Sequence, residues 1–188
     1  MYAKEYLALI ISAIAVGVSI TGFTIFTNPI IGIVMVLLLS TSFIVHELSH
    51  RLEARKLGYI SFYRINKMGL LLTLVSFFLP FKIIAPGEVA FYSLYRIPSV
   101  KDVATISLMG PLSNILLAIA LKTSCIILSV QGFNNYVVDL LFHVGSFNGY
   151  IAFFNLIPIP PLDGSKIVRF SLQLWFTLLL SATILFIV

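Results

Sequence analysis

The sequence predicts an all-α polytopic membrane protein with about five transmembrane helices and a small membrane-associated β-sheet between the second and third helices. Two observations lead to this prediction. Hydrophobic residues fill 60% of the 188 positions and charged residues only 10%, whereas a soluble domain is about 45–50% apolar and about 25% charged. A chain this short cannot hide that apolar excess from water. The uncharged residues also form runs close to the roughly 20 residues that an α-helical crossing needs.

Each predicted span is a charge-poor run bounded by polar residues. The first two spans share one long uncharged stretch, which the turn dipeptide Asn28-Pro29 divides. A polar break separates the third span from the fourth. No internal repeat or linker is visible, so residues 1–188 are interpreted as a single domain. We expect helices over residues 6–26, 30–53, 103–130, 137–157 and 168–188.

The region 59–95 is predicted to hold the sheet. Leu70–Phe78 and Val89–Tyr95 are rich in β-forming residues, and prolines and a glycine separate them. A sheet edge exposed to lipid would leave backbone groups without partners, so the sheet must face water or protein. We therefore expect it at the membrane surface, where its edge could pair with an unwound substrate segment by strand addition.

The charge distribution predicts the orientation of the chain. Twelve Lys and Arg residues against seven Asp and Glu give a net charge of +5. All the basic residues except Lys122 fall at the N-terminus or in the connections after the second and fourth spans. By the positive-inside rule, the N-terminus then faces the cytoplasm. We interpret the charge as this orientation signal and not as a nucleic-acid surface. The single cysteine, Cys125, excludes an intrachain disulfide and a cysteine-based zinc site.

The strongest chemical signal is His46-Glu47-Leu48-Ser49-His50, near the inner end of the second span. Residues four apart share a helical face, so the two imidazoles can reach one metal ion. Glu47 lies beside His46 and can act as a base toward the attacking water. Ionisable residues inside an apolar helix are costly, which favours a functional role over coincidence.

A catalytic zinc site uses three protein ligands, so a third must come from elsewhere. The candidates are Asp163, Asp139, His143 and Glu53. Asp163 is favoured because it follows the fourth span on the inner side, whereas Asp139 and His143 lie near the outer side. Glu53 follows His50 on the same helix, where its geometry as a third donor is awkward.

Asp163 belongs to an irregular segment, Asn155-Leu156-Ile157-Pro158-Ile159-Pro160-Pro161-Leu162-Asp163-Gly164. A continuous helix cannot pass through its prolines, and unwound backbone at membrane depth must be buried in protein or line a wet cavity. Counting back from Phe170 places Asp163 near the interface, while His46 lies about 15 Å from the Lys56 end of its helix. The segment must therefore fold inward to join the histidines.

A third motif, Gly110-Pro111-Leu112-Ser113-Asn114, interrupts the third span. Asn114 lies about 18 Å along a helix from Asp102, close to the estimated depth of His46. Two interpretations stay open at this point. Its amide could donate a hydrogen bond to substrate or to an oxyanion, or it could pack helices together beside a Gly-Pro irregularity.

Together the three motifs resemble the site-2 protease family of intramembrane zinc metalloproteases, in the family's order. The resemblance implies that His46, His50 and Asp163 bind one Zn²⁺ ion, that Glu47 is catalytic and that Asn114 helps to position substrate. It also implies supporting roles near the metal for Asn155, Gly110, Pro111 and Gly164. The chain departs from relatives that insert a PDZ domain, carry a nucleotide-sensing domain or have six spans.

We therefore expect a zinc-dependent intramembrane endopeptidase that cleaves transmembrane segments of membrane proteins, in regulated intramembrane proteolysis. Its expected partners are a transmembrane protein substrate and the lipid bilayer, with no nucleic acid. The minimal architecture favours a prokaryotic cytoplasmic membrane, with the active site toward the cytoplasm. The main alternative is a metal-ion transporter or channel that uses the same His and Asp residues. A purely structural membrane subunit would bind no metal.

Overall fold

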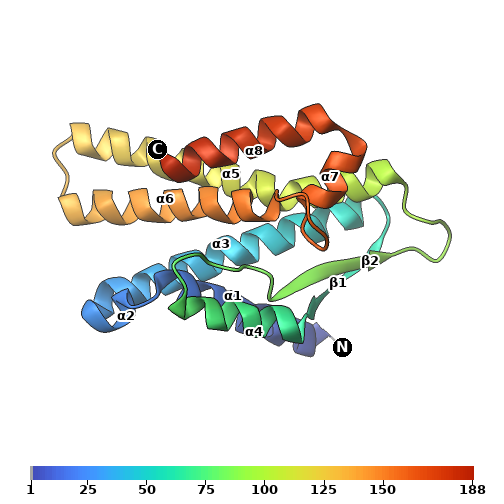
Figure 1. The fold of residues 1–188 in the computed structure, drawn as a ribbon, viewed down its shortest axis with the longest axis horizontal. Coiled ribbons are helices and arrows are strands. Elements are labelled where there is room, and N and C mark those ends of the chain that lie inside the picture. Colours follow the sequence, from blue (N-terminus) through green and yellow to red (C-terminus); the bar gives the residue numbers. More distant parts are fainter. Residues whose placement is uncertain (1) are drawn as a thin grey trace.

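The computed structural model describes residues 2–188, and most of them are helical (Figure 1). Four helices in this part of the chain are long and apolar enough to cross a membrane: α1, α3, α5 and α6. The elements in chain order are α1 (Tyr2–Thr21), α2 (Thr24–Thr27), α3 (Pro29–Lys56), β1 (Ile60–Ile65), α4 (Lys67–Val75), the 3₁₀ helix η1 (Ser76–Phe78), β2 (Gly87–Tyr92), α5 (Val100–Val130), α6 (Asn135–Asn155), α7 (Gly164–Phe170) and α8 (Leu172–Ile187).

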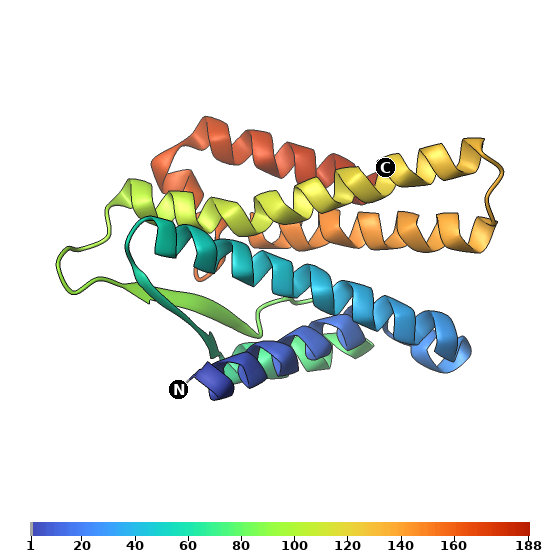
Figure 2. The same cartoon turned by 180° about the vertical axis from the view of Figure 1, so that it is seen from behind.

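Helix α3 occupies the middle of the fold and carries the His46–His50 motif. Helices α5, α6 and α8 lie on one side of it, and α1 and α4 lie on the other (Figures 1 and 2). The boundaries follow local chemistry. Asn28 caps α3 ahead of a proline in its first turn, and Ser99 and Asp102 form a capping box that begins α5.

Two apolar clusters hold these layers together. One lies between α1, α3, α6 and the strands and includes Val16, Leu39 and Ile151, which are fully buried. The other joins α5, α6, α7 and α8 around Leu156 and Ile167. Phe43 of the first cluster stacks on the ring of His46, with the ring centroids 6.5 Å apart, and Leu156 of the second cluster lies in the segment that leads to Asp163.

The last predicted span, 168–188, is not one continuous helix. Ser171 has extended backbone and separates α7 from α8, and its hydroxyl accepts a hydrogen bond from the Leu174 N–H at the start of α8. The 16 residues of α8 extend about 24 Å, less than the hydrocarbon core of roughly 30 Å. The expected count of five crossing helices is therefore not confirmed.

The predicted sheet is present, and its second strand, β2, overlaps the predicted strand Val89–Tyr95, but its partner is β1. β1 pairs with β2 in antiparallel register, with Ile60 opposite Tyr92. The predicted strand over Leu70–Phe78 is wrong, because these residues form α4 and η1. Asn66 explains the difference, since its Oδ1 accepts a hydrogen bond from the Gly69 N–H at 3.0 Å and so caps a helix at this point.

Helix α4 lies alongside α1. This half of the region 59–95 therefore does not form a flat layer over one end of the molecule, as a sheet at the membrane surface would. The Ser19 hydroxyl on α1 donates to the Thr73 carbonyl at 2.6 Å, and the Phe23 and Phe77 rings lie 5.0 Å apart. Ser19 lies in the last turn of α1, and Phe23 follows shortly after the end of that helix. The segment α4–η1 therefore re-enters along the length of α1.

The return segment after η1 is fastened through Lys82. Its Nζ donates to three backbone carbonyls of the η1 turn at 3.0–3.2 Å. The Tyr150 hydroxyl on α6 accepts from the Lys82 N–H and donates to the Lys82 carbonyl. Such contacts supply the partners that irregular backbone needs away from water. Lys82 Nζ approaches Gly22, just after the end of α1. Lys82 therefore lies away from the end of the molecule where the positive-inside rule placed it with the other basic residues.

Candidate metal centre

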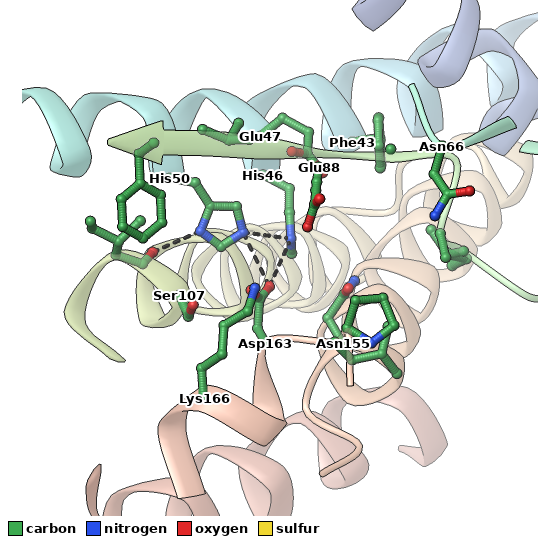
Figure 3. Close-up of a pocket in the computed structure, with 18 residues that line it drawn as sticks. Phe43, His46, Glu47, His50, Asn66, Glu88, Ser107, Asn155, Asp163 and Lys166 are labelled. Atoms are coloured by element: carbon green, nitrogen blue, oxygen red, sulfur yellow. Dashed lines mark hydrogen bonds and ion pairs between the residues drawn. The ribbon is translucent and has the colours of Figure 1, made fainter. Parts of the chain in front are cut away.

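Three potential ligand atoms from two separate segments converge in the interior (Figure 3). The Nε2 atoms of His46 and His50 lie 3.1 Å apart. Asp163 Oδ2 lies 3.5 Å from His46 Nε2 and 3.1 Å from His50 Nε2. All three residues are buried. The structure thus brings together the two histidines of the α3 motif and the favoured third ligand.

The hydrogen bonds on the far side of each ring define which nitrogen carries the proton. His50 Nδ1 donates to the Ile106 carbonyl at 2.7 Å, and His46 Nδ1 donates to Asn114 Oδ1 at 2.6 Å. In the neutral imidazoles both Nε2 atoms then present lone pairs. Two lone pairs and a carboxylate oxygen face one another with no hydrogen between them. This donor set is suited to bind a cation.

The spacing of the three atoms fits zinc. Tetrahedral coordination with bonds of about 2.0–2.1 Å separates neighbouring ligand atoms by about 3.3 Å. The three measured separations fall between 3.1 and 3.5 Å. Two nitrogens and one carboxylate oxygen also match the ligands of catalytic zinc sites, which keep a fourth position for water or substrate.

Helix α5 passes close to this cluster at Gly110. A β-carbon there would overlap His50 Nε2, so only glycine leaves the space between the ligands open. The next residue, Pro111, lies within the helix and removes a backbone donor. The Gly-Pro irregularity of the third span is thus a point of close approach to the candidate metal site.

The position of Asp163 is explained by α7. Helix α6 ends at Asn155, and the chain then turns back toward α3 before α7 begins at Gly164 (Figure 1). Helix α7 fills the seven residues between Asp163 and the corner at Ser171, a length of about 10 Å, so Asp163 and the start of α8 lie at opposite ends of this short helix. Trp175 Nε1 on α8 donates to the Leu156 carbonyl at 2.7 Å and fastens the loop.

Gly164 permits this fold because a β-carbon there would collide with the Leu156 carbonyl. The other carboxylate oxygen of Asp163, Oδ1, faces the Lys166 ammonium at 3.4 Å. Oδ2 is thereby left for the imidazoles. Lys166 is a contributor that sequence reasoning used only as an orientation charge, although its spacing three residues after Asp163 on a helix is a readable signal.

Glu47 lines the same pocket as the three ligand residues. Its side chain is buried, and its Oε2 atom has no hydrogen-bond partner. An unpartnered buried carboxylate oxygen is costly, and here it lies beside a cluster that can hold a metal and its water. The carboxylate is therefore in place to accept a proton from a water molecule at the cluster.

Asn114 and Asn155 lie at different places relative to the pocket. Asn114 is fully buried, does not line the pocket and holds His46 through its ring nitrogen. Asn155 lines the pocket and donates to the Ile151 carbonyl of its own helix (Figure 3). Asn155 therefore faces the pocket, whereas Asn114 contacts His46 behind it.

The remaining candidates lie elsewhere. His143 Nδ1 donates to the Asp139 carbonyl, and both residues line a second, mainly apolar cavity near Thr24 and Met35, at the other end of α3. Glu53 pairs with Lys56 at 3.5 Å on the exposed end of α3. None of these side chains joins His46 and His50.

Strand β2 forms one wall of the pocket. Gly87, Glu88 and Val89 line it, opposite the Asp163 loop, and Glu88 is drawn beside His46 in Figure 3. Arg64 on β1 donates to the Glu88 carboxylate at 2.6 Å. Sequence reasoning missed Glu88 because nothing in the local pattern distinguishes it from a solvated strand residue.

Comparison with known proteins identifies the family. The sequence profile of peptidase family M50 matches residues 127–186. A Methanocaldococcus jannaschii protein, named as a candidate zinc metalloprotease, is 32% identical over 177 residues, which make up 92% of this chain and 87% of that protein. The chain belongs to peptidase family M50. This membership confirms the resemblance to the site-2 proteases that the three motifs indicated.

A second relative is longer than this chain. This zinc metalloprotease, also from Methanocaldococcus jannaschii, is 31% identical over 152 residues, which cover 81% of this chain and 38% of the relative. The chain therefore spans well under half of that protein. No solved structure matches the chain.

Proposed function

We propose that this protein is a zinc-dependent intramembrane endopeptidase that cleaves transmembrane segments of membrane proteins, in regulated intramembrane proteolysis. The observation that supports this most is the convergence of three lone pairs, from His46, His50 and Asp163, beside the unpartnered carboxylate of Glu47. These groups lie on or against helices apolar enough to cross a membrane. Substrate that reaches them must come from within or beside the bilayer.

In the proposed reaction, a zinc ion supplies Lewis acidity toward water and toward the scissile carbonyl. Glu47 accepts the proton of the attacking water and delivers it to the leaving amine. His46 and His50 hold their Nε2 lone pairs toward the ion, and Asp163 does so with one oxygen while Lys166 retains the other. Asn155 offers an amide to the peptide from the pocket wall.

The free edge of β2 is the proposed docking site for the unwound substrate. The Tyr63 N–H points away from β2 and donates to Glu5 Oε1 at 2.9 Å. In an antiparallel pair, its partner Val89 then also directs its backbone groups away from the ladder. Those groups belong to a pocket-lining strand, so an extended substrate could pair there by strand addition.

The orientation of the protein in the membrane is part of the same proposal. The basic residues near the ends of α1, α3 and α7 support a cytoplasmic N-terminus and active site. We propose a prokaryotic cytoplasmic membrane as the location. Water would then reach Glu47 from the cytoplasmic side of the bilayer.

The deciding experiment compares wild-type protein with Glu47→Gln, purified and reconstituted with a membrane protein that carries one transmembrane helix. Wild type should cleave the substrate within that helix, and Glu47→Gln should bind stoichiometric zinc without cleaving it. Full activity in Glu47→Gln would overturn the mechanism. Zinc flux into liposomes without any proteolysis would instead favour the transporter.

A further inference from the structure

A chain of buried polar groups runs from His46 away from the pocket and crosses three helices. His46 Nδ1 on α3 donates to Asn114 Oδ1 on α5. Asn114 Nδ2 donates to Asn148 Oδ1 on α6 at 2.9 Å. Asn148 Nδ2 donates to the Ser42 hydroxyl at 3.1 Å, back on α3, and to the Val144 carbonyl at 2.9 Å. Asn114 and Asn148 are both fully buried.

The direction of every hydrogen bond in this chain is determined by its far end. The Ser42 hydroxyl donates to the Leu38 carbonyl at 3.0 Å, so toward Asn148 it can only accept. The two amide hydrogens of Asn148 are thereby committed to Ser42 and Val144, and its Oδ1 must face Asn114. Backbone carbonyls therefore define the orientation of Asn148. Asn148 Oδ1 at 2.9 Å and, at a longer 3.5 Å, the Ser42 carbonyl both accept from Asn114 Nδ2 and so define the orientation of Asn114.

The amide orientation of Asn114 matters because it selects the tautomer of His46. With Oδ1 toward the ring, Nδ1 keeps its proton and Nε2 keeps a lone pair for the metal. A reversed amide would place an N–H donor against Nδ1 and favour a proton on Nε2, where it would block metal binding. His50 has no comparable dependence on side chains, because a backbone carbonyl holds its Nδ1.

We propose that Asn148 is a positioning residue for the metal centre: together with Ser42 it fixes the amide of Asn114 and through it the metal-binding tautomer of His46. The proposal rests on the zinc site of the proposed function and adds a residue that touches neither metal nor substrate. Groups behind metal-binding histidines typically change metal affinity by 10–100-fold when they are removed.

Two substitutions at Asn148 distinguish positioning from packing. Asn148→Asp keeps an oxygen acceptor toward Asn114 and, as the neutral acid, one donor, which can serve either Ser42 or Val144 but not both. Asn148→Leu keeps the volume and removes the acceptor. Positioning therefore predicts that Asp preserves the site better than Leu. A role limited to packing between apolar helices predicts the reverse, because a buried acid is costly and leucine is not.

The test measures zinc affinity of the full-length protein in detergent by competition with a chromogenic chelator, and the visible spectrum of the Co²⁺ form. Asn148→Leu should lower zinc affinity by 10–100-fold and weaken the tetrahedral Co²⁺ bands, whereas Asn148→Asp should stay near wild type. Ser42→Ala should show a smaller loss. Tyr150→Phe is the matched control, since it removes hydrogen bonds from α6 two residues further on and should leave affinity unchanged.

Wild-type zinc affinity and an unaltered Co²⁺ spectrum in Asn148→Leu would overturn the proposal. So would greater loss in Asn148→Asp than in Asn148→Leu, with thermal stability falling in parallel. Both of these outcomes presuppose that the wild-type protein itself binds zinc and cleaves substrate. Failure of the wild type to do either would overturn the proposed function itself, so the two failures can be distinguished.

Discussion

A β-carbon on Gly110 would lie 2.6 Å from Nε2 of His46, inside the space on which the three ligand atoms converge. The Gly-Pro motif of α5 and the histidine motif of α3 therefore form one site. Gly110→Ala should reduce zinc content to background, because the new methyl group occupies the position of the ion. Metal analysis of the purified variant measures this.

The control for this substitution is Gly145→Ala on α6. A β-carbon there meets the flexible Lys122 side chain, at 3.1 Å. It should retain zinc and gain up to about 1 kcal/mol of helix propensity. Normal zinc content in Gly110→Ala would contradict the placement of the metal between α3 and α5.

Removing the metal should lower the stability of the folded protein as well as abolish its activity. Without an ion, three buried lone pairs face one another, so the folded state loses the stabilisation that binding supplies. At a free zinc concentration 100 times the dissociation constant, that stabilisation is about 2.7 kcal/mol. We expect a chelator to lower the unfolding temperature and zinc, but not Mg²⁺, to restore it. An Asp163→Ala variant should show a much smaller response, and an equal response there would contradict a role for Asp163.

The buried ion pair beside the site should contribute strongly to stability. Arg51, next to His50, binds Glu5 on α1 through two nitrogens, at 3.0 and 3.3 Å. Arg51→Met leaves the Glu5 carboxylate without its partner and should cost about 3–5 kcal/mol of unfolding free energy. The double variant Glu5→Gln/Arg51→Met should recover much of this loss. Denaturation of wild type, Arg51→Met, Glu5→Gln and the double variant in one detergent measures it, and additive losses of the two single variants would contradict the pairing.

A proline at a position of β2 whose N–H points away from β1 can test strand addition without disturbing the hairpin. Val89→Pro removes an N–H that points away from β1, so cleavage should slow at least tenfold while zinc content stays normal. Val89→Ala controls for the side chain and should cleave normally. Ala90→Pro breaks the β1 ladder and should unfold the hairpin. Unchanged turnover in Val89→Pro would exclude strand addition and leave the protease assignment intact.

The sequence predicted the candidate metal ligands better than it predicted the secondary structure of the segments that connect the long helices. His46, His50 and Asp163 could be identified because ionisable residues are conspicuous in apolar helices and because their spacing has a direct chemical meaning. Leu70–Phe78 was assigned to a strand because short apolar runs do not distinguish helix from strand by periodicity. Asn66 and Ser171, each a helix cap, were signals that could have corrected both the strand and the unbroken last span.

The role of Asn114 shows a different limit. The rise of about 1.5 Å per residue along a helix predicted correctly that Asn114 lies level with His46. It does not predict which neighbouring residue the side chain faces. That depends on the packing of α3, α5 and α6, which no local pattern encodes. Asn148 could have been noticed as a polar residue in an apolar helix, yet only the packed structure connects it to His46.

The return of the Asp163 loop to α3 has a consequence for biosynthesis. Asp163 follows His50 by 113 residues in the chain, and its loop is fastened only once Trp175 has been made. During translation, the histidine helix is therefore synthesised and available for membrane insertion well before its third ligand exists. A partly synthesised chain carries two imidazoles and a glutamate but no complete metal site. If the proposed function holds, cleavage can begin only after the residues up to Trp175 have left the ribosome, so a shorter nascent chain cannot cleave the membrane proteins around it.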